Sequence, residues 1–150
     1  MAFCFQVKHS LQSGAPAEHV IFDSPCKSRA DIRTCLELGV HINCDNLDEL
    51  ERVIESREGL LASGGTTTAT VGVRINPLLG FGGIEALSVS NIESKFAVAL
   101  TDENRAIIID YFKAHDWLCC IHVHVGSQGC PLPMLAEGAD VIVNSCNFHP

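Results

Sequence analysis

The chain has 150 residues, of which 47% are hydrophobic, so it carries enough apolar material for the core of one globular domain. Ten Lys and Arg residues stand against 18 Asp and Glu residues, and the formal net charge of -8 excludes the basic surface that binds nucleic acid or an anionic membrane. No apolar run approaches the ~20 residues that are needed to span a bilayer.

Helices and strands alternate along the first half of the chain. A segment that ends at Gly14 has the spacing of the last turns of a helix, and Pro25 ends the first strand because proline cannot donate to a sheet. Ser28 and Asn46 precede apolar stripes and are predicted N-caps, with Glu49 three residues after Asn46 as in a capping box. The predicted elements are a helix at 7–14, a strand at 19–22, a helix at 28–39, a strand at 40–43 and a helix after 46.

The second half continues the same alternation. Val71, Val73 and Ile75 alternate with Gly72 and Arg74, and this period of two is typical of a strand. Small residues form a loop before it, and a long span that follows it is irregular. The predicted elements are a loop at 63–68, a strand at 70–75, an irregular span at 78–98, a helix at 101–115 and a strand at 117–125.

Four strands alternating with helices predict a parallel α/β architecture. Arg74 and Asn76 share one face of their strand, and His122 and His124 share one face of theirs. An open sheet that is covered on both faces seldom carries such polar faces, whereas a barrel can point them into its lumen near the rim where sites gather. We therefore expect a partial (β/α)8 TIM-type barrel of about four consecutive βα units.

The last predicted strand leads into a possible anion site. It ends at Gly126, Ser127, Gln128 and Gly129, where small residues leave backbone N–H groups free and Ser127 adds a hydroxyl. His124 precedes this turn by two residues. The pattern is suited to holding a phosphate group beside an imidazole.

Arg74 is a permanent charge on an otherwise apolar strand, so it requires an anionic or acceptor partner. One interpretation places the guanidinium beside a bound anionic ligand. The other is an internal ion pair, for which Asp45 is the candidate. Both stay open on the sequence alone.

Five motifs resemble the pyridoxal-phosphate-dependent ornithine/diaminopimelate/arginine decarboxylases, a family with an alanine-racemase-like barrel. The resemblance favours the diaminopimelate branch and covers residues 1–138 as part of the pyridoxal-phosphate-binding barrel domain, with 139–150 as a divergent tail. The motifs, in order, are Phe22-Asp23-Ser24-Pro25-Cys26-Lys27, Asn43-Cys44-Asp45 with Asp48-Glu49-Leu50, Val73-Arg74-Ile75-Asn76-Pro77, Ser94-Lys95-Phe96 and His124-Val125-Gly126-Ser127-Gln128.

The resemblance implies a cofactor, pyridoxal 5′-phosphate, and roles for four residues. His124 matches the histidine that stacks on the pyridine ring, Gly126 and Ser127 match the contacts to the phosphate, and Arg74 matches an arginine beside the cofactor. It also implies a small-molecule substrate, a diamino or basic amino acid, and homodimers of the full-length proteins. Lys27 and Lys95 lie in family motifs, but we expect both to be surface lysines.

The chain departs from the family where the chemistry is most demanding. The family's Schiff-base lysine lies in an A-x-K-A-N motif that is absent, and Lys8, in a superficially similar segment, fits better on the helix before the first strand. The glycine-rich phosphate loop, the acidic partner of the pyridine nitrogen, and the Cys and Tyr of the carboxy-terminal domain are also missing. We therefore assign no catalytic residue and expect a fragment that is not a competent decarboxylase by itself.

The cysteines and the first residues bear on the compartment. The eight cysteines have no paired CxxC spacing, and the opening residues lack the basic start and apolar run of a secretory signal. Reduced thiols in a cytoplasmic protein are expected, and an organelle is the alternative.

Two functions from other classes remain open. The His122-x-His124 pair on a barrel strand has the spacing of a zinc chelate in a metal-dependent hydrolase, although only His41 and Asp45 are available as further ligands and we assign no metal site. A non-catalytic, decarboxylase-like binding or regulatory protein explains the missing lysine equally well.

Overall fold

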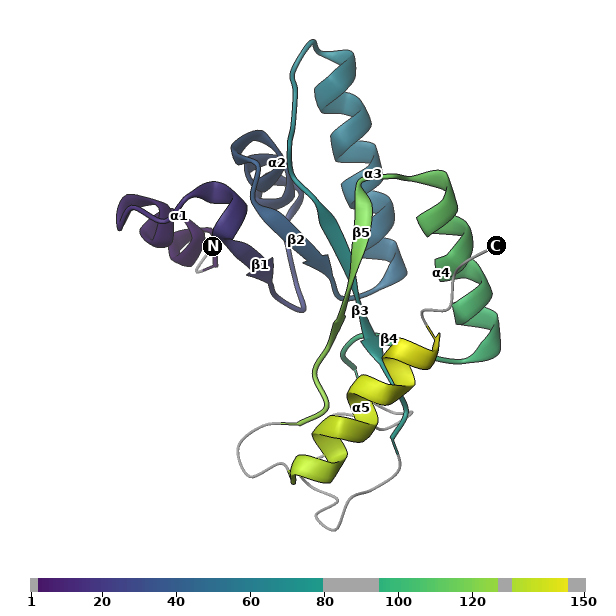
Figure 1. The fold of residues 1–150 in the computed structure, drawn as a ribbon. Coiled ribbons are helices and arrows are strands. Elements are labelled where there is room, and N and C mark those ends of the chain that lie inside the picture. The colour runs from purple at the N-terminus through teal and green to yellow at the C-terminus, as the bar shows by residue number, and fades with distance from the viewer. Residues whose placement is uncertain (1–2, 80–94, 127–130, 146–150) are drawn as a thin grey trace.

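The computed structural model describes residues 3–79, 95–126 and 131–145, which form a parallel sheet flanked by helices (Figure 1). Strand β2 lies between β1 and β3. Strand β5 pairs with most of β3, and the short β4 pairs with its end. The strands are β1 (Ile21–Asp23), β2 (His41–Cys44), β3 (Val71–Asn76), β4 (Val98–Ala99) and β5 (Leu118–Val123).

Helices provide the crossovers that parallel strands require. One helix connects β1 to β2, the next connects β2 to β3, and another connects β4 to β5. The helices are α1 (Phe3–Gln12), α2 (Arg29–Leu38), α3 (Leu47–Ala62), α4 (Asp102–Ala114) and α5 (Leu132–Ser145), with a short 3-10 helix, η1 (Ala17–His19), before β1. This order matches the expected succession of βα units.

Local sequence sets the helix ends as predicted. The Ser28 hydroxyl accepts a hydrogen bond from the Asp31 N–H, and the Asp31 carboxylate accepts one from the Ser28 N–H, which completes a capping box at α2. Gly39 ends that helix with a φ of 76°, a left-handed conformation that glycine adopts without strain. The Asn46 side chain accepts from the Glu49 N–H and caps α3.

One face of the sheet is apolar and packs against the helices. Phe22, Ile42 and Val73 come from three neighbouring strands, and each is fully buried. Because burial of apolar area is the main favourable term in folding, this layer holds the sheet and the helices together. The helices add Ile32, Cys35, Leu36, Leu50, Val53, Ile54 and Ile108 to the same core.

The structure differs from the sequence-based expectation at several boundaries. Strand β1 begins at Ile21 rather than at 19, because His19 belongs to η1. Strand β4, in the expected irregular span, was missed because two residues carry no periodic signal. Helix α5 extends across residue 138, and the expected boundary of the barrel domain at that residue stays a prediction.

The described cysteines and helices bear on two further expectations. Cys26, Cys35, Cys44, Cys119 and Cys120 are free thiols. Burial, with a contribution from the Glu49 carboxylate, raises the pKa of the Cys44 thiol to about 12, so this thiol stays protonated. None of the helices in the described part combines the length and apolar character of a membrane span.

Candidate functional site

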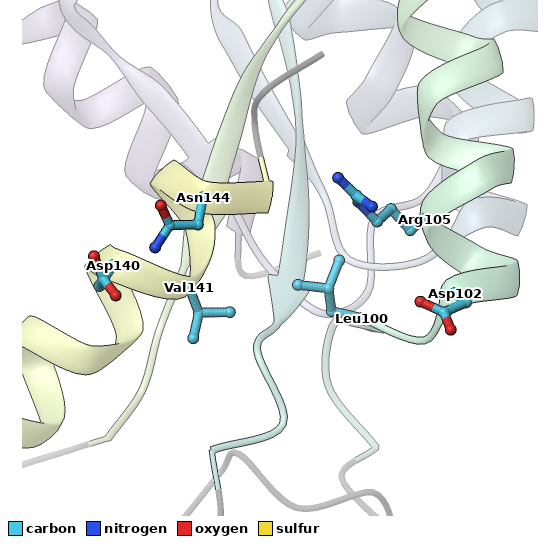
Figure 2. A pocket seen from close by; sticks show the side chains of 6 residues that line it. All are labelled: Leu100, Asp102, Arg105, Asp140, Val141 and Asn144. Carbon is cyan, nitrogen blue, oxygen red and sulfur yellow. The ribbon is translucent and has the colours of Figure 1, made fainter.

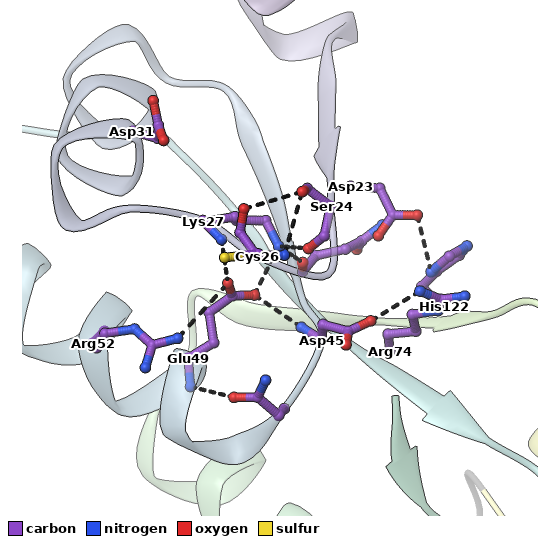
Figure 3. Close-up of polar contacts among 12 residues, drawn as sticks. Asp23, Ser24, Cys26, Lys27, Asp31, Asp45, Glu49, Arg52, Arg74 and His122 are labelled. Carbon is purple, nitrogen blue, oxygen red and sulfur yellow. Dashed lines mark hydrogen bonds and ion pairs between the residues drawn. The ribbon is translucent and has the colours of Figure 1, made fainter. Parts of the chain in front are cut away.

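Four polar side chains meet where neighbouring strands end (Figure 3). Asp23 is the last residue of β1, Asp45 directly follows β2, and Arg74 and His122 lie in the second half of β3 and β5. Arg74 and His122 are register partners, so their side chains leave the same face of the sheet. Because parallel strands end at a common edge, the four groups form one polar cluster, which we call the strand-end cluster.

A close ion pair holds Arg74 within this cluster. Its Nη1 lies 2.8 Å from Asp45 Oδ1, and the side chains are 11% and 2% exposed. The guanidinium carbon lies 5.4 Å from the centre of the Phe96 ring, within the range of a cation–π contact. The internal ion pair with Asp45, one of the two interpretations that the sequence left open, is thus present. The Arg74 Nε is buried without a hydrogen-bond partner among the described residues, so one donor stays uncommitted.

His122 lies between acidic and basic neighbours. Its Nδ1 is 3.7 Å from Asp23 Oδ2, beyond hydrogen-bond distance, and both Nδ1 and Asp23 Oδ1 are buried without partners in the described part. Burial lowers the pKa of His122, Asp23 opposes this shift, and Arg74 and His124 add to it. We therefore expect a neutral imidazole near neutral pH.

The structure covers the predicted phosphate end only in part. His124 directly follows β5 and is exposed, and Gly126 is half-buried. Ser127 lies outside the described residues. Arg74 lies in the second half of β3 and His124 directly follows β5, and the role of each toward a cofactor stays a prediction.

Lys27 is not the surface lysine that we expected. Its side chain is fully buried, as is that of Glu49, and Lys27 Nζ lies 2.7 Å from Glu49 Oε2. Sequence reasoning missed the pair because it assigned the Glu49 side chain to a capping box. In the structure the Asn46 side chain caps α3 by accepting the Glu49 N–H, and the Glu49 carboxylate pairs with Lys27 instead. Lys95 is exposed as expected, and Lys8 is exposed on α1, where the sequence placed it.

The described residues give no support to a metal centre. No group of three or more His, Cys, Asp or Glu residues in the ranges 3–79, 95–126 and 131–145 is arranged to hold a metal ion. Both ring nitrogens of His41 are already engaged, one with the Thr70 hydroxyl and one with the Asn43 side chain. The hydrolase alternative therefore lacks its further ligands in this part of the chain.

A hollow of about 370 Å³ lies between α4 and α5 (Figure 2). It contains no residue of the strand-end cluster and none of the predicted cofactor contacts. Its lining mixes polar and apolar side chains, namely Leu100, Asp102, Arg105, Asp140, Val141 and Asn144. The strand-end cluster remains the candidate site because its geometry joins residues from four strands.

Comparison with protein families gives a match over nearly the whole chain. Residues 6–147 match the model described as "Pyridoxal-dependent decarboxylase, pyridoxal binding domain". This range includes the whole strand-end cluster, the predicted phosphate end and most of the tail that we expected to diverge.

Curated relatives include the diaminopimelate decarboxylases of Pseudomonas fluorescens and Pseudomonas aeruginosa. The first is 27% identical over 136 residues, covering 90% of this chain and 32% of the relative. The second is 31% identical over 128 residues, covering 82% and 29%. The L-glutamyl-[BtrI acyl-carrier protein] decarboxylase of Niallia circulans is 27% identical and covers 88% and 30%. The chain thus spans about a third of the length of these relatives.

Solved structures agree on the fold. Diaminopimelate decarboxylase from Helicobacter pylori, complexed with L-lysine, superposes with a TM-score of 0.78 at 21% identity, covering 95% of this chain and 35% of that chain. The arginine decarboxylase of Paramecium bursaria Chlorella virus gives a TM-score of 0.64 at 17% identity, covering 98% and 37%. The prediction of a partial barrel is confirmed.

Proposed function

Because the chain belongs to the pyridoxal-dependent decarboxylase family, through its pyridoxal binding domain, we propose that its strand ends form part of a pyridoxal 5′-phosphate site. The observation that carries this proposal is the position of Arg74. It lies at the carboxyl end of the sheet, where barrel sites gather, and its buried Nε has no partner among the described residues.

The residues present fit such a ligand. An uncommitted guanidinium N–H suits an acceptor atom of an anionic cofactor, and the neutral His122 beside it adds a group that can donate or accept. His124 would lie against the face of the pyridine ring. Gly126 and Ser127 would hold the phosphate through backbone N–H groups and the hydroxyl.

The cofactor, when bound, would supply an electron-accepting ring for the electron pair that stays on the substrate's α-carbon when the carboxyl group leaves as carbon dioxide. The residues of this chain would hold and orient that ring and keep the Arg74 charge near it. Among the described lysines, Lys27 is committed to Glu49 and Lys8 lies on α1, so neither is placed to attach the cofactor. We therefore infer that the chain binds the cofactor but does not catalyse the decarboxylation by itself.

We propose that the activity to which this domain contributes is decarboxylation of a diamino acid such as diaminopimelate. The diaminopimelate decarboxylases among the relatives support this substrate class. The Niallia circulans relative is named for a different substrate. The proposed substrate class therefore rests on the several diaminopimelate decarboxylases among the relatives and not on a described residue.

The test is a titration of the chain with pyridoxal 5′-phosphate, followed by quenching of Trp117 fluorescence. We expect reversible binding that His124→Ala and Arg74→Ala each weaken at least about tenfold, since each removes a contact worth at least about 1.4 kcal/mol. Borohydride treatment should leave no cofactor attached to Lys8, and diaminopimelate should release no carbon dioxide. Absence of binding by the unmodified chain, or a reduced adduct at Lys8, contradicts the proposal.

A further inference from the structure

The pair formed by Lys27 and Glu49 is buried and almost completely hydrogen-bonded (Figure 3). All three protons of the ammonium have acceptors: Lys27 Nζ lies 2.6 Å from the Ser24 carbonyl, 2.6 Å from the Asn43 carbonyl and 2.7 Å from Glu49 Oε2. The carboxylate accepts two backbone N–H groups in addition, from Lys27 at 3.1 Å and from Asp45 at 2.9 Å. The desolvation of both charges is therefore offset by directed contacts.

These contacts join three segments that are distant in the sequence. Ser24 and Lys27 belong to the loop after β1, Asn43 and Asp45 mark the end of β2, and Glu49 lies in the first turn of α3. Each segment ends or begins at the edge of the sheet that carries the strand-end cluster. The ion pair thus fixes the relative positions of the chain segments that surround the site.

The contacts continue from Glu49 to Arg74. Glu49 holds the backbone N–H of Asp45, and the carboxylate of the same Asp45 pairs with the guanidinium at 2.8 Å. Asp45 is only 2% exposed, so its side chain has little freedom to turn elsewhere. We propose that Lys27 and Glu49 are positioning residues, which set the Asp45 carboxylate and through it hold Arg74 at the carboxyl ends of the strands.

Stability alone does not account for this arrangement. Apolar side chains of similar volume commonly replace buried ion pairs without loss of stability, because desolvation cancels much of the attraction. An apolar pair has no acceptor, so it cannot hold the backbone N–H groups of Asp45 and Lys27 as the Glu49 carboxylate does. The Arg29–Glu55 pair connects α2 to α3, at 2.6 Å, but its side chains are 63% and 58% exposed and it reaches no residue of the strand-end cluster. Glu55 on α3 is therefore a matched control.

The experiment follows the Arg74 Nε–H by NMR in the whole chain, through its chemical shift and its exchange with solvent. Glu49→Gln removes the charge and one acceptor while keeping the shape, and Lys27→Met removes the ammonium while keeping the stem. In both folded variants we expect a shifted signal and exchange at least about tenfold faster, and in Glu55→Gln we expect no change. A folded variant of Glu49 or Lys27 with an unchanged Arg74 signal overturns the proposal. Failure of both variants to fold also overturns it, because the pair would then be required by the fold itself.

The link to ligand binding rests on the proposed function, and a second measurement tests it. The same variants should weaken binding of pyridoxal 5′-phosphate by a factor similar to that of Arg74→Ala, and Glu55→Gln should leave it unchanged. If the unmodified chain does not bind the cofactor, the proposed function fails, while the NMR signal still decides whether Lys27 and Glu49 position Arg74. If the cofactor binds and the variants bind it as well as the unmodified chain does, the positioning proposal fails and the proposed function stands.

Discussion

The two faces of the sheet are built from alternate residues of the same strands, and they differ in what they contribute. In β1, Phe22 is fully buried against the helices, while the side chain of its neighbour Asp23 is 37% exposed on the other face. In β3, Val73 is fully buried and Arg74 reaches the strand-end cluster. The helix-covered face thus supplies apolar burial, and the opposite face supplies charges in register.

Because alternate residues of a strand point to opposite faces, one short strand contributes to the core with one face and to a binding site with the other. Apolar contacts on the covered face are numerous and undirected, so they stabilise the sheet whatever the other face carries. The polar face retains buried atoms that have no partner among the described residues, at Asp23, Arg74 and His122, and each lowers stability unless a ligand or water satisfies it. A face that carries such atoms is organised for binding rather than for stability.

The largest expected effect comes from truncating neighbouring residues of β1 that lie on opposite faces of the sheet. Phe22→Ala should lower the free energy of unfolding by about 3–5 kcal/mol, because it removes a fully buried ring and leaves a cavity. Asp23→Ala, one residue away, should change it by less than about 0.5 kcal/mol. Urea denaturation of the two variants measures both values. Similar losses of unfolding free energy in the two variants would contradict the conclusion that the helix-covered face supplies most of the stability.

A smaller effect is expected at Gly72, which lies on the polar face where two neighbouring strands approach closely. A Cβ at this position would lie 2.6 Å from Asn43 Oδ1 and 3.1 Å from the Cys120 Cβ. Gly72→Ala should therefore lower the free energy of unfolding by roughly 1–3 kcal/mol, since overpacking forces a neighbour to move.

The matched control for this substitution is Gly59→Ala in α3. A Cβ at Gly59 meets nothing within 4 Å, and alanine is the better helix former by about 0.5–1 kcal/mol. The two glycine substitutions should shift the urea midpoint in opposite directions. A stabilising Gly72→Ala would mean that there is more space between Gly72 and its neighbours Asn43 and Cys120 than the structure indicates.

Alternation and caps made most of the fold predictable. Val71, Val73 and Ile75 opposed Gly72 and Arg74 in the sequence, and this pattern assigned Arg74 to the polar face correctly. Helix ends at Ser28 and Gly39 followed from capping preferences that depend only on nearby residues. Short strands shifted by one or two residues; in β1 the shift arises because His19 belongs to η1.

Register and long-range pairing were not predictable from local patterns. The irregularity between Val71 and Gly72 inserts an extra residue in β5, and only this offset sets His122 opposite Arg74. The sequence analysis considered His122 as a metal ligand and did not pair it with Asp23. Likewise, Lys27 and Glu49 are 22 residues apart and of types that are usually exposed, so no local signal joined them.

The smallest expected effect concerns the pH response of the polar face, through Asp23 and His122. The folded-state pKa of His122 lies below its ordinary value of 6.5, so the unfolded chain binds more protons and stability falls as pH decreases from about 6.5 through the folded-state pKa. Asp23→Asn removes the carboxylate that raises this pKa, so the loss on the acid side should deepen. Because both side chains are partly exposed, we expect only about 0.3–0.5 kcal/mol between about pH 5 and about pH 8.

An NMR titration of the imidazole and urea denaturation at the two pH values measure this change, with Glu55→Gln as the control for loss of a carboxylate on an exposed ion pair. The control should leave the pKa of His122 where it is, because Asp23, Arg74, His124 and Asp45 are the charges that act on this imidazole. An unchanged His122 pKa in Asp23→Asn would contradict this prediction, because a carboxylate that lies 3.7 Å from the ring nitrogen has to favour the protonated imidazole.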